Sequence, residues 1–380
     1  MKHIKKIGIA ASMLLIALIL AACGNIDNTT SVENGANEQD SVQTTGQTSK
    51  DDYAGVIKNG HYLVSKARGL TAARNSNNFN ITSFEAGLLD ISKGYYKPAD
   101  YIFQEGQYLS MDRVQSWLAR QTKDNKNGLN PVDNGKKNNK RNPIYIQSIE
   151  EQDFMQKNGK KLSLKGMTIG IAMNPIDYYQ KQQYGATFEQ KIDHDAMVKY
   201  GQEAAAKIVQ RIRKLKKIPS NMPIAIAMYE QAPNDSLVGG EYYAVTQTTG
   251  DKITKWDKMN IANKVFPLIG SATGYASNDN KNFQNFQSQV QHFFPTIAGL
   301  TAQAQYVNKK LAGEHITITT QFYSQTEIIS FTNFLAQVAP KFTPSGVPVD
   351  ITVNSATDIQ AYLSRGADDR DFSSHVFGSY

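Results

Sequence analysis

The sequence is poor in cysteine, because Cys23 is the only one among 380 residues. A chain with one cysteine forms no internal disulfide, so the stability of its folded part must come from packing. A second thiol for cysteine-based metal or redox chemistry is also lacking. The six histidines are scattered without the spacing of metal ligands. We therefore expect neither a metal site nor a cofactor.

Common catalytic motifs are lacking as well. The sequence contains no His-Glu-x-x-His, no Gly-x-Ser-x-Gly, no Ser-x-x-Lys and no Gly-x-x-x-x-Gly-Lys. The carboxylates of Glu150, Glu151 and Asp153 offer groups for acid–base chemistry, but a solvated helix start is the interpretation we favour. The sequence thus predicts no catalytic residues and a protein that is not an enzyme.

The positive charge is modest. A formal net charge of +7 is small for a nucleic-acid-binding protein of this length, so we expect no nucleic-acid partner. The most basic stretch is Lys123–Arg141. Its composition favours a solvated surface loop, with contact to lipid headgroups or teichoic-type polyanions as the alternative.

The N-terminus has the pattern of an export signal. Three lysines among the first six residues precede an apolar run, Ile7–Leu20, which is shorter than the ~20 residues that span a bilayer. The small residues Ala21 and Ala22 then precede Cys23, as in lipoprotein signals. We expect signal peptidase II to cleave between Ala22 and Cys23, after a diacylglyceryl transferase has modified the Cys23 thiol. The mature chain would then be anchored in membrane lipid on the extracytoplasmic face.

The signal peptide, residues 1–22, is followed by a polar stretch over residues 23–52. This stretch is made almost entirely of Asn, Thr, Ser, Gly, Gln, Asp and Glu. It has too little apolar surface to offset the entropy of ordering, so it predicts a disordered tether. A flexible chain of this length would hold the folded part on the order of 30 Å from the membrane.

Similar sequence patterns recur in the two halves of the remaining chain, residues 53–380. Asn158–Leu162 resembles Val307–Leu311, and each precedes a strand-like run, Met167–Met173 or Ile316–Phe322. Each run is followed by a helical pattern and a second short strand that opens at a proline. The predicted helices are His194–Leu215 and Ile328–Phe342, and the second strands begin at Met222 and Val347.

Further matches lie upstream of these elements. Each half is predicted to hold a β-hairpin and then a helix, Met111–Arg120 or Trp256–Val265, and another helix is predicted over Phe283–Leu311 with a break at Pro295. The fold predicted is α+β, with two topologically similar repeats, residues 53–233 and 234–380. Each repeat is expected to hold mixed or antiparallel strands with helices packed on one face.

Several segments resemble a known family. The lipoprotein signal, Ser83–Ser92, Tyr101–Leu109 and Gly128–Pro131 are similar to the CamS family, Gram-positive lipoproteins that are precursors of sex pheromones in conjugation. The resemblance covers essentially the whole chain and implies two copies of one domain. It also implies that the pheromone is the apolar end of the signal peptide, here the heptapeptide Ile16-Ala17-Leu18-Ile19-Leu20-Ala21-Ala22.

The first three residues of this heptapeptide depart from the family's pattern. Family peptides resemble Ala-Ile-Phe-Ile-Leu-Ala-Ala, whereas this chain has Ile16, Ala17 and Leu18 before the shared Ile19–Ala22. The resemblance implies a pheromone receptor that reads the released peptide by side-chain fit. We expect a receptor tuned to the usual peptide to respond more weakly to this one.

Three functions remain open for the chain. The first, which we favour, is a non-enzymatic lipoprotein precursor whose mature domain has a binding or structural role. The second is an extracytoplasmic ligand-binding lipoprotein of a transporter, which would need a larger doubly wound α/β pattern. The third is a cell-wall-active enzyme with an acid pair. A deep apolar pocket between the repeats would favour binding, and two close buried carboxylates would favour catalysis.

Overall fold

The computed structural model describes residues 32–33, 41–47, 49–74, 76–159, 161–268, 274–321 and 324–378. Cys23, the cleavage position after Ala22 and the heptapeptide Ile16–Ala22 lie outside these residues. Within them, no helix is both long and apolar enough to cross a membrane.

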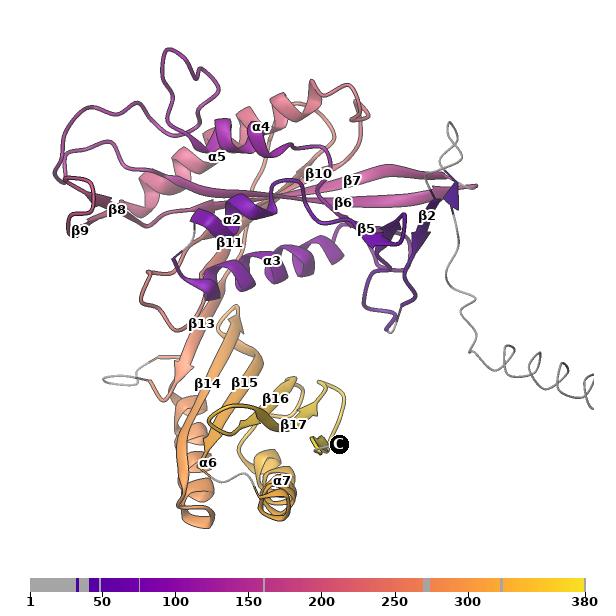
Figure 1. Ribbon diagram of the computed structural model, residues 1–380, viewed down its shortest axis with the longest axis vertical. Coiled ribbons are helices and arrows are strands. Elements are labelled where there is room, and N and C mark those ends of the chain that lie inside the picture. Colours follow the sequence, from indigo (N-terminus) through magenta and orange to yellow (C-terminus); the bar gives the residue numbers. More distant parts are fainter. Residues whose placement is uncertain are drawn as a thin grey trace, which may run out of the picture.

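The first half of the chain builds a six-stranded sheet with the order β12-β11-β10-β7-β6-β5 (Figure 1). Only β7 and β10 are parallel, and the other neighbours are antiparallel. The strands are β5 (Ile102–Glu105), β6 (Ile146–Asn158), β7 (Lys161–Met173), β10 (Ile224–Glu230), β11 (Glu241–Thr248) and β12 (Asp257–Lys258). The helices are α2 (Arg68–Arg74), α3 (Asn78–Lys93), α4 (Met111–Leu118) and α5 (His194–Arg213).

Helices cover both faces of this sheet, not one face as predicted. On β7, Ile169 and Ile171 belong to the core cluster that contains α5 residues such as Ile208. The opposite face packs against α3, where a Cβ on Gly170 would lie 2.9 Å from the Phe84 ring. The physical reason is that the second half of β7 is apolar on both faces, as in buried strands of parallel pairs.

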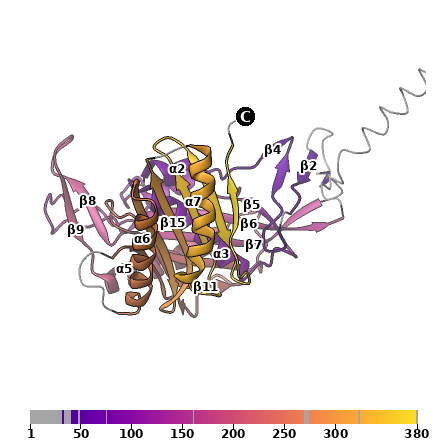
Figure 2. The ribbon, with the colours of Figure 1, turned by 90° about the horizontal axis from the view of Figure 1, so that it is seen from below.

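The second half builds another six-stranded sheet, with the order β13-β14-β15-β16-β17-β18. Its helices, α6 and α7, lie on one face, as Figure 2 shows. The strands are β13 (Ile261–Phe266), β14 (Ile297–Val307), β15 (Lys310–Thr320), β16 (Val349–Asn354), β17 (Ile359–Arg365) and β18 (Ser373–Val376). The helices are α6 (Ser277–Phe293), α7 (Gln325–Val338) and the short 3-10 helix η1 (Ala339–Lys341).

The two sheets have the same strand order and the same strand directions. In each, a hairpin (β6–β7 or β14–β15) is followed by a helix and a parallel strand (β10 or β16), then by an antiparallel strand (β11 or β17). Leu162 and Leu311 take the same place after the hairpin turn, opposite Lys157 and Tyr306. The α+β fold with similar topology in the two halves is therefore present, and common descent of the halves stays a prediction.

The sheet register corrects one sequence match. Met167 pairs with Ile224, and its counterpart Ile316 pairs with Ile351. Ile224 thus corresponds to Ile351, two residues beyond the Val349 that the sequence match had aligned with it. The loops before β10 and β16 differ in length, which similarity around the two prolines could not reveal.

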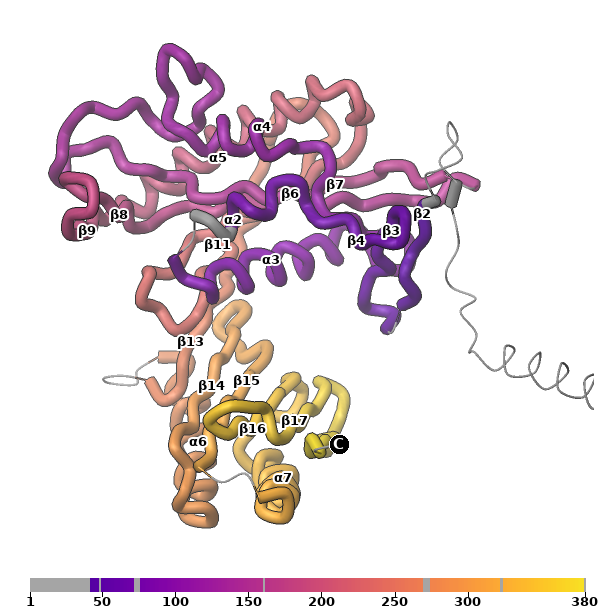
Figure 3. The backbone as a smooth tube through the Cα atoms, viewed as in Figure 1, coloured from indigo at the N-terminus to yellow at the C-terminus, as the bar shows by residue number. Residues whose placement is uncertain are grey.

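The boundary between the halves also lies later than the predicted 233/234. β11 and β12 pair with the first sheet through β10, so that sheet ends at Lys258. The second sheet begins at Ile261. The chain passes from β12 into β13, which lies below β11 in Figure 3. Strand pairing between distant residues, which local sequence does not show, sets this boundary.

Two predicted helices are wrong in whole or in part. Residues 256–265 form β12 and β13, because β13 pairs along its length with β14. The helix expected over Phe283–Leu311 ends at Phe293, and β14 follows Pro295. Conversely, α3 was not predicted.

The end of the expected tether is ordered. The strands β1 (Val32–Glu33), β2 (Ser41–Thr44), β3 (Val56–Lys58) and β4 (His61–Tyr62) form a small sheet in that order. Val42 and Thr44 of β2 are buried, which gives this polar segment an inward face. A second small sheet is the hairpin β8 (Ile176–Gln180) and β9 (Thr187–Lys191).

Candidate functional site

The carboxylates predicted at a solvated helix start lie instead on strand β6. Glu151 and Asp153 are buried, and successive side chains of a strand point to opposite faces. Glu150 therefore faces away from Glu151 and Asp153. The prediction failed because these charged and polar residues belong to a strand that is packed on both faces, although such a run of residues is typical of an exposed segment.

Glu151 and Asp153 form a buried carboxyl pair with a structural role. The Tyr108 and Leu109 backbone N–H groups donate to Glu151 at 2.9 and 2.8 Å, and Gln107 N–H donates to Asp153 at 2.9 Å. Burial raises the pKa of both groups, and the Glu151 charge raises that of Asp153 further. Asp153 Oδ2 also accepts from Gln104 Nε2 at 3.3 Å, whereas Asp153 Oδ1 is buried without a hydrogen-bond partner among the described residues. The pair fixes the loop before α4 and lines none of the cavities described below.

Glu150 lines a partly enclosed cavity of about 280 Å³ on the other side of β6. The cavity lies against α2, α3, β5 and β6. Apolar side chains form part of its wall, and five ionisable or phenolic groups surround the rest. The apolar side chains are Ala67, Ala86, Leu89, Phe103 and Ile149, and the polar groups are Tyr62, Arg68, Glu85, Glu105 and Glu150.

Arg68 faces three carboxyl groups in this cavity. Its guanidinium lies 3.4 Å from Glu105 Oε1 and 3.9 Å from Glu85 Oε2. Burial raises the pKa of Glu85, although Arg68 opposes the shift. Glu105 also accepts a hydrogen bond from the Ser65 backbone N–H at 2.6 Å. Half of the Arg68 side chain is exposed, so Arg68 only partly compensates the carboxylates.

Glu150 is the most perturbed group of the cavity. Its Oε2 atom is buried and has no hydrogen-bond partner among the described residues. Burial, with the charges of Glu85 and Glu105 adding to it, raises the pKa of Glu150 to about 8. The carboxyl group is therefore protonated at neutral pH. A positively charged group in the cavity would compensate its ionised form.

The arrangement suits an organic cation better than a metal ion. Over the part of the chain that the structure describes, no group of three His, Cys, Asp or Glu side chains could hold a metal. An ammonium or guanidinium group needs less strict geometry, and the apolar wall would accept a hydrocarbon body attached to it. Ligand pockets typically combine such a wall with a few convergent polar groups.

Sequence reasoning singled out Glu150 but missed Arg68, Glu85 and Glu105. These residues come from separate elements, so no linear motif joins them. One signal was present. Ser83–Ser92 and Tyr101–Leu109, two of the segments that carry the family resemblance, contribute Glu85 and Glu105 to the cavity.

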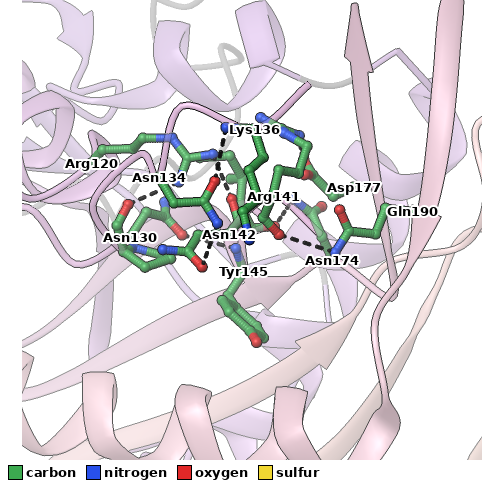
Figure 4. A network of polar contacts seen from close by, with 12 residues as sticks. Arg120, Asn130, Asn134, Lys136, Arg141, Asn142, Tyr145, Asn174, Asp177 and Gln190 are labelled. Carbon is green, nitrogen blue, oxygen red and sulfur yellow. Dashed lines mark hydrogen bonds and ion pairs between the residues drawn. The ribbon is translucent and has the colours of Figure 1, made fainter. Parts of the chain in front are cut away.

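The basic stretch Lys123–Arg141 is an exposed loop with a firmly held base (Figure 4). Asn130 Nδ2 donates to Leu118 O and Ile146 O, at 2.8 and 3.0 Å. Arg120 donates to Pro131 O and Asn142 O. Arg141, at the end of the loop, pairs with Asp177. The favoured interpretation of a solvated loop fits this arrangement, and contact of its lysines with polyanions stays a prediction.

An open groove of about 370 Å³, lined by both apolar and polar groups, lies between α3 and the second sheet. Across it, Asn263 Nδ2 donates to Gly240 O and Gln303 Nε2 donates to Leu237 O, each at 3.0 Å. Glu314 lines the groove, and burial with the Asp279 charge raises its pKa to about 7. The groove is open to solvent, so it is not the deep pocket that would have favoured ligand binding between the halves.

Known proteins resemble this chain over most of its length. The family model described as CamS sex pheromone cAM373 precursor matches residues 62–371. A crystal structure of a sex pheromone precursor from Lactobacillus salivarius is 50% identical, with a TM-score of 0.86, and the match covers 89% of this chain and 100% of that one. No curated protein sequence matches.

A second solved structure agrees. The C-terminal domain of the sex pheromone staph-cAM373 precursor from Staphylococcus aureus is 28% identical, with a TM-score of 0.70. That match covers 80% of this chain and 99% of the other. The family match spans most of the chain, and the L. salivarius structure agrees in both sequence and fold. The chain belongs to the CamS family of sex pheromone precursors.

Proposed function

We propose that the chain is a membrane-anchored lipoprotein precursor with two products. The first is the apolar heptapeptide Ile16–Ala22, released from the signal peptide as a sex pheromone. The second is the mature chain, held by a diacylglyceryl group on Cys23 at the extracytoplasmic face. Family membership and the lipoprotein pattern around Cys23 support this proposal. A diacyl group supplies the two chains that stable anchoring needs.

The mature domain is proposed to bind a small organic cation with an apolar body. The single observation that carries this proposal is the cavity around Glu150, in which one arginine faces three carboxyl groups beside an apolar wall. A bound cation would stabilise the ionised form of Glu150, so that binding releases a proton. The buried pair Glu151 and Asp153 gives less support to a cell-wall-active enzyme, because three of its four oxygens accept hydrogen bonds from the chain and neither residue lines the cavities described above.

Titration of the full-length protein with benzylamine tests the binding proposal, with benzyl alcohol as the uncharged comparison. Calorimetry should detect binding of benzylamine and little or no binding of benzyl alcohol. Affinity should rise as pH increases toward about 8, by up to about tenfold per unit, because one proton is released on binding. Glu150→Gln should weaken binding and remove this pH dependence.

Glu327→Gln is the matched control, since Glu327 is exposed on α7 of the second sheet. It should leave benzylamine affinity unchanged. Equal affinity for benzylamine and benzyl alcohol, or an unchanged affinity in Glu150→Gln, would contradict the cation site.

A further inference from the structure

A separate cavity of about 320 Å³ lies where the parallel strands β7 and β10 end. The segments that follow these strands, residues 174–178 and 231–234, form much of its wall. Because β7 and β10 run in the same direction, both segments leave the sheet at the same edge. Ligand sites of sheets with parallel strands commonly form at this edge. The cavity shares no lining residue with the one around Glu150.

Most polar groups of the wall are held in place by the protein itself. Asn174 Nδ2 donates to Ile144 O at 3.0 Å and to Gln147 Oε1 at 3.1 Å. The Asn234 backbone N–H donates to the Tyr178 hydroxyl at 3.1 Å. These contacts fix the amide and hydroxyl groups around the cavity before any ligand arrives.

Gln231 is the exception. Its side chain is buried, with the residue 8% exposed, and it lines the cavity. The backbone N–H of Gln231 donates to Met173 O at 3.0 Å. The side-chain Nε2, however, is buried without a hydrogen-bond partner among the described residues. A buried donor without an acceptor is costly and rare in folded proteins, and an acceptor on a bound ligand would satisfy it.

The charge of the wall limits the class of ligand. Among the described residues, Asp177 is the only carboxylate that lines the cavity, and Arg141 pairs with it (Figure 4). Asn174 lies beside this pair in the same network. The remaining polar groups are amides and hydroxyls, and the half-buried Tyr178 adds an aromatic ring. A neutral ligand with several oxygen acceptors fits such a wall, and a charged ligand would gain little from it.

We propose that this cavity binds a neutral saccharide of one or two rings, with a carbonyl or hydroxyl oxygen accepting a hydrogen bond from Gln231 Nε2. Amide side chains donate to and accept from sugar hydroxyls, and a tyrosine ring packs against the apolar face of a sugar. The volume is at the lower end of the range of ligand pockets, which fits a ligand of this size. The site is independent of the proposed cation site.

N-acetylglucosamine is the probe for this site, because it carries both hydroxyl groups and an acetamide carbonyl. We would titrate it into the full-length protein in detergent and follow the Gln231 side-chain amide by NMR. Binding should shift this amide signal and saturate. Glucosamine, which is cationic and lacks the carbonyl, should bind at least about tenfold more weakly.

Gln231→Met removes the unpaired donor with little change of shape. It should lower N-acetylglucosamine affinity at least about tenfold while the melting temperature stays the same or rises, because the buried donor is gone. Gln231→Glu, which also lacks the donor, should bind weakly as well. Gln284→Met, the same change at an exposed position on α6, is the matched control and should bind as the unmodified protein does.

Three results would overturn the proposal. The first is the lack of a saturable shift at about 10 mM N-acetylglucosamine. The second is undiminished affinity in Gln231→Met or Gln231→Glu. The third is tighter binding of glucosamine than of N-acetylglucosamine. If Gln231→Met does not fold, the Gln231→Glu titration and the amide shift of the unmodified protein decide between the outcomes.

Discussion

Glu151 and Asp153 lie on the same buried face of β6, where burial and the charge of Glu151 raise the pKa of Asp153. The two residues together accept three hydrogen bonds from the backbone of residues 107–109. The pair resembles the acid pair of an enzyme in composition, but both oxygens of Glu151 and Oδ2 of Asp153 accept hydrogen bonds from the chain itself. Its function in this fold is to hold the loop that leads into α4.

Substitutions at Asp153 test this structural role. Asp153→Ala should lower the free energy of unfolding by about 1–3 kcal/mol, because Gln107 N–H and Gln104 Nε2 lose their acceptor in a buried site. Asp153→Asn should cost less, since its amide keeps both a donor and an acceptor. Urea unfolding near neutral pH measures the free energy of unfolding of both variants. Equal stability of the unmodified protein and Asp153→Ala would show that the pair does not support the loop.

The pH dependence of the folded protein's stability should report the ionisation of Glu150. The folded-state pKa of about 8 lies above the ordinary value of 4.5, so the folded protein holds a proton that the unfolded chain has lost between these values. Stability therefore falls as pH rises from about 5 to 8, by about 1.4 kcal/mol per unit for a fully retained proton. The contribution of Glu150 to stability is fully present below pH 4.5, the ordinary pKa, and is lost above about pH 8.

Glu150→Gln isolates this effect from the other raised carboxyl groups. The difference in unfolding free energy between Glu150→Gln and the unmodified protein should grow in favour of the variant as pH rises through this window. Glu327→Gln, at an exposed position, should show no such trend. A constant difference from pH 5 to 8 would mean that Glu150 ionises normally in the folded protein.

Cys23→Ala tests the anchor. Without the thiol no diacylglyceryl group can be attached, so the signal should remain uncleaved and the distribution between membrane and soluble fractions should change. Intact mass measurement and fractionation report both. If mass and membrane partition match those of the unmodified protein, Cys23 is not the lipidated residue.

The first three residues of the heptapeptide should weaken its activity in recipients tuned to the usual family peptide. In an apolar slot, one methylene changes discrimination by ~1–3 kcal/mol, and Ile16, Ala17 and Leu18 all differ from Ala-Ile-Phe. Synthetic Ile16–Ala22 should thus require a higher concentration than the family peptide to induce recipient aggregation. The mature chain alone should be silent. Aggregation induced by purified residues 53–380 would show that the folded part carries the signal.

Local pattern was enough to predict the central elements of both sheets. The helical spacing of Met197, Ala204, Ile208 and Ile212 indicated α5, and all four are buried. The strand-like run Met167–Met173 lies within β7. In contrast, β13 forms because it pairs with β14, so its conformation depends on a distant segment. The local sequence pattern therefore led to the wrong prediction of a helix at this position.

The candidate sites were less predictable than the fold. Glu150 was noticed as part of a charged cluster, but its environment depends on Arg68 and Glu85, which only tertiary packing brings near it. Gln231 gave no sequence signal, because an amide residue after a strand is ordinary. Its significance comes from the lack of a partner for a buried nitrogen, which only the structure shows.

Mass spectrometry of spent medium tests the central claim most directly. Cells that produce the unmodified chain should release a peptide with the mass and fragmentation of Ile16–Ala22. Cells that produce the same mature chain behind an unrelated lipoprotein signal should not release it, although their mature chain is anchored normally. If the mature chain begins at Cys23 and yet no Ile16–Ala22 peptide appears in the medium, the chain is not a source of this pheromone.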